Sequence, residues 1–300
     1  MYICKLLGVG KMFLPDLILR EKLRKMLEED VGFGDITTEI IVPENLKVKA
    51  QIIAKESGVI AGIEDISVLF KELNINIESA ISDGSKVNAG TVIMEIEGPA
   101  KSILTCERTI LNLLMRMSGI ATLTHQMIRE AKKVNPKVIV AGTRKTAPGL
   151  RYFDKKAIKI GGGDTHRLRL DDCILIKDNH VVIAGGVKEA IKRAKEAVSF
   201  TKKIEVEVQS MEDALAAAKE GADIIMLDNM KPEEIKKVIK KLKEEGLREK
   251  VLIEASGRIN LENIKEYAST GVDIVSLGYI THSVKSLDIS LEIIEIRKNT

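Results

Sequence analysis

From Val187 onward, amphipathic helices alternate with short apolar strands, and this alternation constrains the fold more than any other feature of the sequence. The strands are apolar on both faces, which is typical of a parallel sheet that helices cover. The pattern places strands at 203–208, 223–229, 251–257 and 272–278 and helices at 187–198, 211–220, 231–246 and 261–270. The sequence therefore predicts an α/β fold with a parallel sheet.

The ends of these helices carry matching signals. Pro232 lies near the first turn of the helix 231–246 and Gly246 lies at its end, which is the favoured asymmetry. Gly221 and Gly271 are expected to end two further helices. Asn260 is expected to cap the helix at 261–270, because its side chain can accept a hydrogen bond from a free backbone N–H.

The N-terminal third follows a different pattern. Residues 46–63 and 90–100 alternate between apolar and polar side chains, as half-buried strands do. Between them, residues 64–73 have the spacing of a helix. This part of the chain is therefore predicted to form an α+β domain of its own.

A long helical stretch at 102–134 connects the two patterns, with an expected break near Ser118 and Gly119. A chain of 300 residues is long enough for two unequal domains. We therefore expect an N-terminal domain at 1–115 and a catalytic domain at 116–281.

Charged and small polar residues collect where the predicted strands end. They are Arg144 and Lys145 after the strand at 138–141, Lys177 after 174–176, Glu207 within 203–208, Asp228 in 223–229, Ser256 and Gly257 in 251–257, and Gly278 at the end of 272–278. In an α/β barrel the carboxyl ends of the strands form one rim, and active sites are built there. The sequence therefore predicts that these side chains face one common site.

The predicted rim is sorted by charge along the chain. The cations, all in the early part, are Arg144, Lys145, His166, Arg167 and Lys177. Arginine binds carboxylate or phosphate through two hydrogen bonds, so this wall suits a polyanion. Glu207 and Asp228 follow and suit Mg²⁺, which prefers oxygen ligands and substrate phosphates. The late glycines and Ser256 suit a phosphate monoester. Together these groups indicate phosphoribosyl pyrophosphate and an acidic second substrate.

The composition excludes several other classes of protein. The chain has 47 basic and 44 acidic residues and only 3% aromatic residues, so neither a broad basic face nor stacking platforms for nucleic acid are indicated. No apolar stretch has the length of a membrane span. Three widely spaced cysteines are typical of a reducing, cytoplasmic location. The residues before Met12 have no cleavage signal, and they are expected to be either an upstream start or a loosely attached extension.

Less specific roles remain open for several of these residues. His166 could be a scaffold histidine and Glu205 a simple ion-pair partner. Arg151 and Arg169 are expected to be structural residues or to lie at the edge of the site. Lys177 could form a Schiff base in an aldolase, although the many neighbouring cations fit that chemistry poorly, and an RNA-binding role is disfavoured by the even charge balance.

Across residues 20–297 the chain resembles the quinolinate phosphoribosyltransferase family, also called nicotinate-nucleotide pyrophosphorylase (carboxylating). The stretches that carry the resemblance are EEDVGFGDITT (28–38), ILTCERTILNLLMRMSGIAT (103–122), GTRKTAPGLR (142–151), GGGDTHRLRLDD (161–172), IKDNH (176–180), EVEV (205–208), MLDN (226–229), EASG (254–257) and THSVKSLDISLEI (281–293). Many motifs in the same order make chance agreement negligible.

The resemblance implies an N-terminal α/β sandwich and an incomplete α/β barrel of roughly seven strands. Residues 282–300 are then expected to pack back on the first domain. It also implies a cytoplasmic homodimer, or a hexamer built from dimers, with shared active sites. The implied reaction joins quinolinate to phosphoribosyl pyrophosphate and gives nicotinate mononucleotide, pyrophosphate and CO₂ for NAD biosynthesis.

The resemblance also implies a role for each site residue. Those expected to hold quinolinate are Arg144, His166, Arg167 and Lys177, with Arg108 reaching in from a neighbouring subunit. Thr143 and Lys145 are expected towards the pyrophosphate. Glu207 and Asp228 would bind Mg²⁺ and the ribose, and Lys177, Glu207 and Asp228 are the expected catalytic residues. The expected cup for the 5′-phosphate is Ser256, Gly257, Arg258, Gly278, Tyr279 and Ile280.

One departure from the family pattern concerns the phosphate cup. Arg258 stands where the family usually has a second glycine, so the cup is either reshaped or gains a cation. The nearest rival activities are those of nicotinate phosphoribosyltransferase, a related type II phosphoribosyltransferase, and the related molybdenum-transport-associated protein. Nicotinate has only one carboxylate to hold, so the number of cations favours quinolinate.

Overall fold

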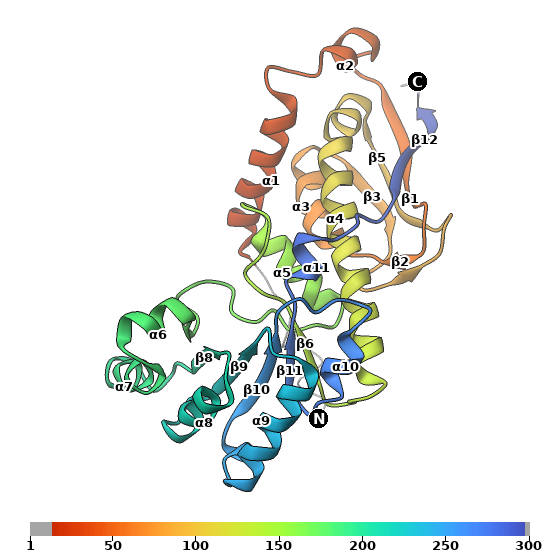
Figure 1. Cartoon of the computed structure of the whole chain (residues 1–300). Helices are drawn as coiled ribbons and strands as arrows, with labels where there is room; N and C mark the ends of the chain where they lie inside the picture. The colour runs from red at the N-terminus through yellow and green to blue at the C-terminus, as the bar shows by residue number, and fades with distance from the viewer. Residues whose placement is uncertain (1–13, 298–300) are drawn as a thin grey trace, which may run out of the picture. The chain divides into compact units, whose positions relative to one another are not determined.

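The computed structural model describes residues 14–297, which form the helices and strands drawn in Figure 1. The chain folds into two compact units. The N-terminal unit runs through Thr122 and adds 159–161 and the tail from Val284, and the barrel unit comprises 123–158 and 162–283. The sequence prediction placed these divisions at 115/116 and 281/282. The expected extension before Met12 lies outside the described residues.

The N-terminal unit is built on an antiparallel sheet with the strand order β12-β1-β5-β3. Side chains of β1 alternate between buried and more exposed positions, as the sequence pattern predicts. The last strand runs beside the first, with Arg297 opposite Lys47, so the tail joins this unit. The elements of the unit are α1 (Asp16–Val31), α2 (Ile36–Ile41), β1 (Lys47–Ala54), β2 (Gly58–Val59), α3 (Ile63–Glu72), β3 (Asn76–Ala80), β4 (Lys86–Val87), β5 (Val92–Pro99) and β12 (Ile289–Arg297).

Helix α4 (Ala100–Lys132) is continuous, so the break predicted near Ser118 and Gly119 is wrong. Gly119 instead allows a close approach of backbone, because a Cβ there would lie 2.3 Å from the carbonyl oxygen of Lys285. The Ser118 hydroxyl accepts a hydrogen bond from the backbone N–H of Ala61 at 3.0 Å. Ser118 and Gly119 therefore mark a place where the middle of helix α4 packs against other segments. They do not mark the end of the helix.

The barrel unit contains a parallel sheet with the strand order β6-β11-β10-β9-β8-β7. This confirms the α/β class with a parallel sheet. The sheet has six strands where about seven were expected, and a parallel bridge between Ala141 and Asp164 extends the pairing beyond β6. The strands are β6 (Ile139–Ala141), β7 (Ile174–Ile176), β8 (Ile204–Val208), β9 (Ile224–Asp228), β10 (Leu252–Ser256) and β11 (Ile274–Ser276).

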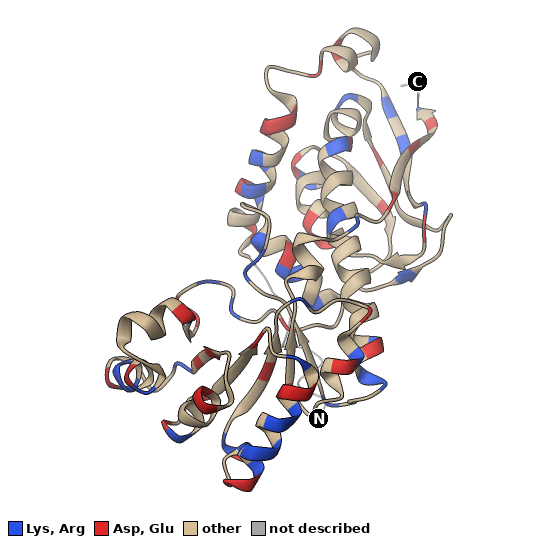
Figure 2. Cartoon of the chain, viewed as in Figure 1, with Lys and Arg blue, Asp and Glu red and all other residues tan. Residues whose placement is uncertain are grey.

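The helices of the barrel unit follow the strands in alternation (Figure 1). They are α5 (Arg151–Ile160), α6 (Asp178–Ala184), α7 (Val187–Ala197), α8 (Met211–Lys219), α9 (Pro232–Glu244), α10 (Ile264–Ala268) and α11 (Tyr279–His282), with a 3₁₀ turn at Arg248–Lys250. Lys and Arg are mixed with Asp and Glu along α7 and α9, so neither helix presents a surface of one sign (Figure 2). Among residues 14–297, no helix has the length and apolar character needed to cross a membrane.

The helix predicted at 261–270 is shorter in the structure, but the side chain of Asn260 does accept hydrogen bonds from free backbone N–H groups before it, as predicted. Asn260 Oδ1 accepts hydrogen bonds from the backbone N–H groups of Glu262 and Asn263 at 2.9 and 3.3 Å. These bonds close a turn, and α10 starts only after it, with Asn263 at the N-cap position. A polar side chain that bonds to nearby backbone competes with helix formation, which explains the delayed start.

Candidate active site

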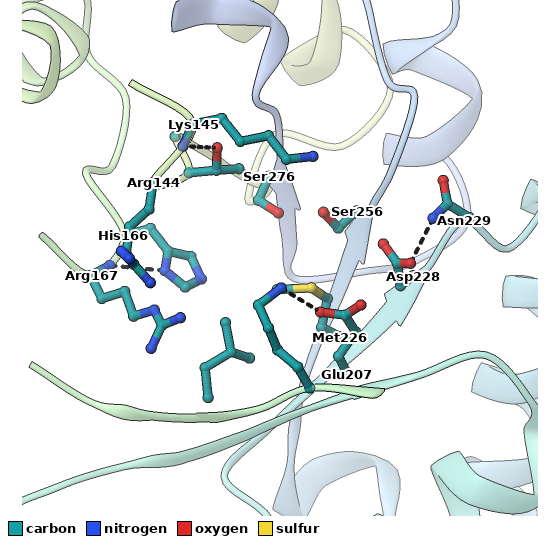
Figure 3. A pocket seen from close by; sticks show the side chains of 14 residues that line it. Arg144, Lys145, His166, Arg167, Glu207, Met226, Asp228, Asn229, Ser256 and Ser276 are labelled. Atoms are coloured by element: carbon teal, nitrogen blue, oxygen red, sulfur yellow. Dashed lines mark hydrogen bonds and ion pairs between the residues drawn. The ribbon is translucent and has the colours of Figure 1, made fainter. Parts of the chain in front are cut away.

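A cavity of about 390 Å³ opens at the carboxyl ends of the parallel strands in the barrel unit (Figure 3). Arg144, His166 and Arg167 lie on one side of it, and Asp228 and Asn229 lie on the opposite side. Its lining residues are Gly142, Thr143, Arg144, Lys145, His166, Arg167, Leu175, Lys177, Glu207, Met226, Asp228, Asn229, Ser256 and Ser276. Four Lys or Arg side chains and two carboxylates therefore share one cavity, which suits an anionic ligand.

Arg144 is the most informative of these cations. Its Nε is buried and has no hydrogen-bond partner among the described residues. Desolvation lowers the pKa of Arg144, and the nearby charges of Arg167 and Arg151 lower it further. A buried, unpaired donor is unfavourable unless a ligand satisfies it. The cavity is therefore arranged to receive an anion at Arg144.

The acidic residues of the cavity come from neighbouring strands. Glu207 lies on β8, and its Oε2 lies 3.0 Å from Lys177 Nζ. Asp228 ends β9, and its Oδ2 accepts hydrogen bonds from Asn229 Nδ2 at 2.6 Å and from Gln209 Nε2 at 3.5 Å. Both carboxylates are thus held in place at the edge of the cavity.

A second cavity of about 240 Å³ shares Thr143, Lys145, Ser256 and Ser276 with the first. Its further lining residues are Gly257, Arg258, Ile259, Asn260, Leu277, Gly278, Tyr279 and His282. Gly257 has a φ of +101°, and a Cβ there would lie 2.4 Å from Asn229 Oδ1, so only glycine fits. Arg258 also has a positive φ, of +51°, without being glycine. Such strain in a non-glycine residue is typical of functional sites.

One partly buried histidine and two buried glutamates form what we call the His166 cluster: His166, Glu205 and Glu254. His166 Nε2 lies 3.4 Å from Glu205 Oε2 and 3.3 Å from Glu254 Oε2. Both glutamates are fully buried. Burial alone lowers the pKa of His166, but hydrogen bonds to the two carboxylates and their charges raise it overall to about 10. Burial raises the pKa of Glu205.

Nine of the predicted site residues line the first cavity, and they are Thr143, Arg144, Lys145, His166, Arg167, Lys177, Glu207, Asp228 and Ser256. Gly257, Arg258, Gly278 and Tyr279 line the second. Ile280 is fully buried and lines neither cavity. Arg108 belongs to the N-terminal unit, where it lines a separate hollow with Asp35 and Thr105.

The structure adds lining residues that the sequence prediction did not include. Asn229 and Ser276 lie at strand ends, so their position in the βα pattern was an available signal. His282 lies on the short helix α11 beyond the last strand and lines the second cavity. No sequence spacing pointed to it, because its place depends on how the chain turns after β11.

The predicted metal ligands Glu207 and Asp228 are suited to Mg²⁺ only if a substrate supplies further oxygen ligands. Among the described residues, the group of three ligand-type side chains close enough to surround an ion is the His166 cluster, not a group containing Glu207 and Asp228. Mg²⁺ is commonly held by one or two carboxylates together with substrate phosphates. Glu207 and Asp228 therefore fit a Mg²⁺ site that a diphosphate substrate completes.

A cavity lined by cations at the strand ends of a parallel α/β unit is typical of enzymes that act on anionic substrates. Matches to protein-family models identify the class of enzyme more narrowly. The quinolinate phosphoribosyl transferase C-terminal domain matches residues 120–292, and the N-terminal domain of the same family matches residues 35–118. The chain belongs to the quinolinate phosphoribosyltransferase family of phosphoribosyl-transferring enzymes.

Named relatives agree with this assignment. The chain is 54% identical over 274 residues to a probable nicotinate-nucleotide pyrophosphorylase (carboxylating) of Methanocaldococcus jannaschii, covering 91% of this chain and 96% of the relative. It is 39% identical over 245 residues to the human nicotinate-nucleotide pyrophosphorylase (carboxylating), covering 82% of each chain.

Solved structures agree as well. The nicotinate-nucleotide pyrophosphorylase of Francisella tularensis superposes with a TM-score of 0.87 at 37% identity, over 94% of this chain and 98% of the other. The human nicotinic acid phosphoribosyltransferase reaches a TM-score of 0.59 at 12% identity over 92% of this chain and 74% of the other, which is a likeness of fold alone.

Proposed function

We propose that this protein transfers the phosphoribosyl group of phosphoribosyl pyrophosphate to quinolinate with loss of CO₂. The products are nicotinate mononucleotide, pyrophosphate and CO₂, and the reaction serves NAD biosynthesis. The family membership supports this reaction, and the observation that carries it is the cationic wall with the unpartnered Nε of Arg144. A dicarboxylate supplies two anionic groups for such a wall.

The cationic wall has a defined task in this reaction. Arg144, Arg167 and Lys177 bind the two carboxylates of quinolinate and orient its ring nitrogen. The nitrogen lone pair forms a bond to the anomeric carbon of the ribose, and the bond from that carbon to the pyrophosphate oxygen breaks with its electrons on the oxygen. The 2-carboxylate then leaves as CO₂, and a proton from water takes its place on the ring carbon.

The carboxylates act on the ribose side. Glu207 and Asp228 stabilise the positive charge that develops on the ribose as pyrophosphate departs. They also hold Mg²⁺, which neutralises charge on the diphosphate when bound. Lys145 and Thr143, which line both cavities, bind the pyrophosphate.

The second cavity receives the 5′-phosphate. Ser256, Gly257 and Gly278 offer small side chains and backbone to the phosphate, and Arg258 adds a cation to the lining of this cavity. The two cavities share lining residues, so one substrate can extend from the diphosphate to the 5′-phosphate across them. Ile280 can contribute only backbone atoms, since its side chain is fully buried.

Arg108 acts in the active site of a partner subunit within a homodimer, or within a hexamer built from dimers. The N-terminal unit exposes the apolar side chains Phe33, Ile36, Ile40 and Ile41, which is typical of a protein interface. Arg108 lines a hollow on this same unit together with Ile36. The protein works in the cytoplasm, as its cysteine usage favours.

Release of ¹⁴CO₂ from quinolinate labelled in the 2-carboxylate tests the proposal directly. Turnover should require both quinolinate and phosphoribosyl pyrophosphate. Nicotinate serves as the control substrate, because it lacks the second carboxylate that the cationic wall holds. Its turnover is followed by release of pyrophosphate, since it has no 2-carboxylate to lose as CO₂. Turnover of nicotinate at a rate equal to that of quinolinate would contradict the proposal and favour the rival activity.

A further inference from the structure

His166 lines the first cavity, whereas its two partners Glu205 and Glu254 do not, and neither glutamate has a role in the chemistry described above. Glu205 and Glu254 come from β8 and β10, which flank β9 in the sheet. Both are fully buried, and apart from the contacts with His166 their carboxylate oxygens have no hydrogen-bond partner among the described residues. Buried carboxylates are unfavourable unless they are paired, so this arrangement needs an explanation.

His166 uses both ring nitrogens inside the protein. Nε2 faces Glu205 and Glu254, while Nδ1 accepts a hydrogen bond at 2.8 Å from the backbone N–H of Arg167. The backbone N–H of His166 donates to Asp164 Oδ1 at 2.7 Å, and its φ is +52°. The ring therefore links the strands of the sheet to the backbone at Arg167.

The tautomer of His166 excludes one alternative for the cluster. The neutral ring accepts at Nδ1 from the Arg167 N–H and carries its hydrogen on Nε2. A ring protonated against the two carboxylates also carries a hydrogen on Nε2, but its Nδ1 then no longer accepts from Arg167. In either state Nε2 has no lone pair to offer a metal ion, although the cluster has metal-like spacing. The hydrogen on Nε2 instead points to the two carboxylates, so the cluster is a structural anchor.

Arg167 is the residue that this anchor affects. Its guanidinium lines the cavity and forms no ion pair with any of the residues 14–297, so its position depends on its backbone. The backbone that precedes Arg167 is fixed by a second contact. The buried Lys155 Nζ donates a hydrogen bond to the carbonyl oxygen of Thr165. Desolvation and the charge of Arg151 lower the pKa of Lys155 to about 8.

We propose that Glu205 and Glu254 are positioning residues that act through His166 to place Arg167 against quinolinate. They determine the affinity for quinolinate without touching it. This inference rests on the proposed function, because quinolinate is the ligand that Arg167 receives. Phosphoribosyl pyrophosphate is bound by other residues of the cavities and is not affected.

Steady-state kinetics of Glu205→Gln and Glu254→Gln test this role. Each variant keeps the side-chain volume and removes the charge that the His166 ring bonds to. Loss of a hydrogen bond between a charged and a neutral group predicts a rise of about tenfold in the KM for quinolinate. The KM for phosphoribosyl pyrophosphate and kcat should stay within about twofold. Glu97→Gln, which alters an ion-paired strand residue of the N-terminal unit, is the control and should change neither KM.

A double-mutant cycle with Arg167→Ala shows whether the effect passes through Arg167. In the Arg167→Ala background, Glu254→Gln should raise the KM for quinolinate by less than about twofold, because the residue it positions is absent. Independent, multiplying effects would overturn the proposal. So would an equal rise in the KM for both substrates, or a bound transition metal lost in the glutamate variants.

Two further measurements keep the outcome decisive. Circular dichroism and thermal melting establish that each variant is folded. If a glutamate variant fails to fold, His166→Gln replaces it, since its amide can still donate to the carboxylates while the acceptor for Arg167 is lost. Absence of quinolinate turnover in the unmodified protein would instead contradict the proposed function itself, which separates the two failures.

Discussion

The rim of the first cavity, where Lys177 meets Glu207, and the His166 cluster, here called the floor, pair the same kinds of charge in opposite environments. At the rim, Lys177 and Glu207 form a pair whose lysine side chain is 47% exposed. On the floor, His166 meets two carboxylates that are 0% exposed. The glutamate of the rim pair is only 11% exposed, but solvent reaches the lysine, so the pair is held less tightly than a fully buried one and Lys177 can turn to a substrate anion. Breaking a buried pair costs about 3–5 kcal/mol, so the floor stays closed.

This difference separates residues that bind from residues that hold the site in shape. Rim residues should alter catalysis and leave stability unchanged, because solvent replaces them. Floor residues should alter stability and the affinity for one substrate. The comparison fails if substitutions in the two regions have the same consequences.

Removal of Mg²⁺ should have the largest effect of all. If the rim carboxylates Glu207 and Asp228 bind Mg²⁺ together with the substrate diphosphate, as we propose, thorough chelation should reduce turnover to background. Added Mg²⁺ or Mn²⁺ should restore it. Asp228→Asn should raise the KM for phosphoribosyl pyrophosphate more than that for quinolinate. Full activity after chelation would refute the metal assignment and leave the rim carboxylates with an electrostatic role alone.

Lys177→Ala and Arg144→Ala should come next in size. Loss of a charge-assisted contact to a desolvated anion is worth about 2–5 kcal/mol. We therefore expect kcat/KM for quinolinate to fall by about 30-fold or more. The melting temperature should change little for Lys177→Ala, because its side chain is half exposed. A variant of either residue with unchanged turnover would remove it from the site.

Arg108 lines neither cavity of the barrel unit, and mixed dimers test whether it completes the rim of a partner's site. Arg108→Ala and Lys177→Ala chains should each be inactive alone. In a two-fold dimer that shares sites, a mixed dimer has one intact site and one with both defects. Random reassortment of equal amounts makes about half the dimers mixed, so about a quarter of the unmodified activity should return.

The mixed-dimer experiment needs two controls. Each variant is unfolded and refolded alone, and the presence of heterodimers is established with differently tagged chains. If proven heterodimers show no recovery, Arg108 acts in its own subunit or outside the site, and the rim is complete within one chain.

The smallest expected effect is a pH dependence of stability that belongs to the floor. The pKa of His166 is raised from 6.5 to about 10 in the folded protein, so its stabilisation is fully present below pH 6.5 and is lost as the pH rises towards 10. Between pH 6.5 and 8, the unmodified protein should lose more unfolding free energy than Glu254→Gln, in which Glu205 alone still raises the pKa of His166.

Urea titrations at several pH values measure that difference. Lys155 has a lowered pKa of about 8, so above pH 8 its deprotonation makes the unfolding free energy rise with pH. The comparison is therefore restricted to pH values between 6.5 and 8. Lys177→Ala, a rim variant, should have the same pH slope as the unmodified protein. Equal slopes of unfolding free energy against pH for Glu254→Gln and the unmodified protein would show that the protonation of His166 is not coupled to Glu254.

The fold class and the rim were predictable because they rest on local pattern. Arg144, Lys177, Glu207 and Asp228 each lie at or near a strand end, and parallel strands bring these ends to one edge. The phosphate cup was partly predictable in the same way, through Gly257. The predicted break at Gly119 failed because glycine can serve either flexibility or close packing, and only the neighbouring Lys285 backbone decides between them.

The sequence by itself determined the alternating elements, the order of charges along the strand ends and the family. Only the tertiary structure decided that His166 meets Glu205 and Glu254 from two other strands. Those contacts depend on the register of β8 and β10 and on burial, which no local spacing encodes. Side chains far apart in sequence gain a strong interaction only once packing has removed the water between them, and that removal belongs to the fold as a whole.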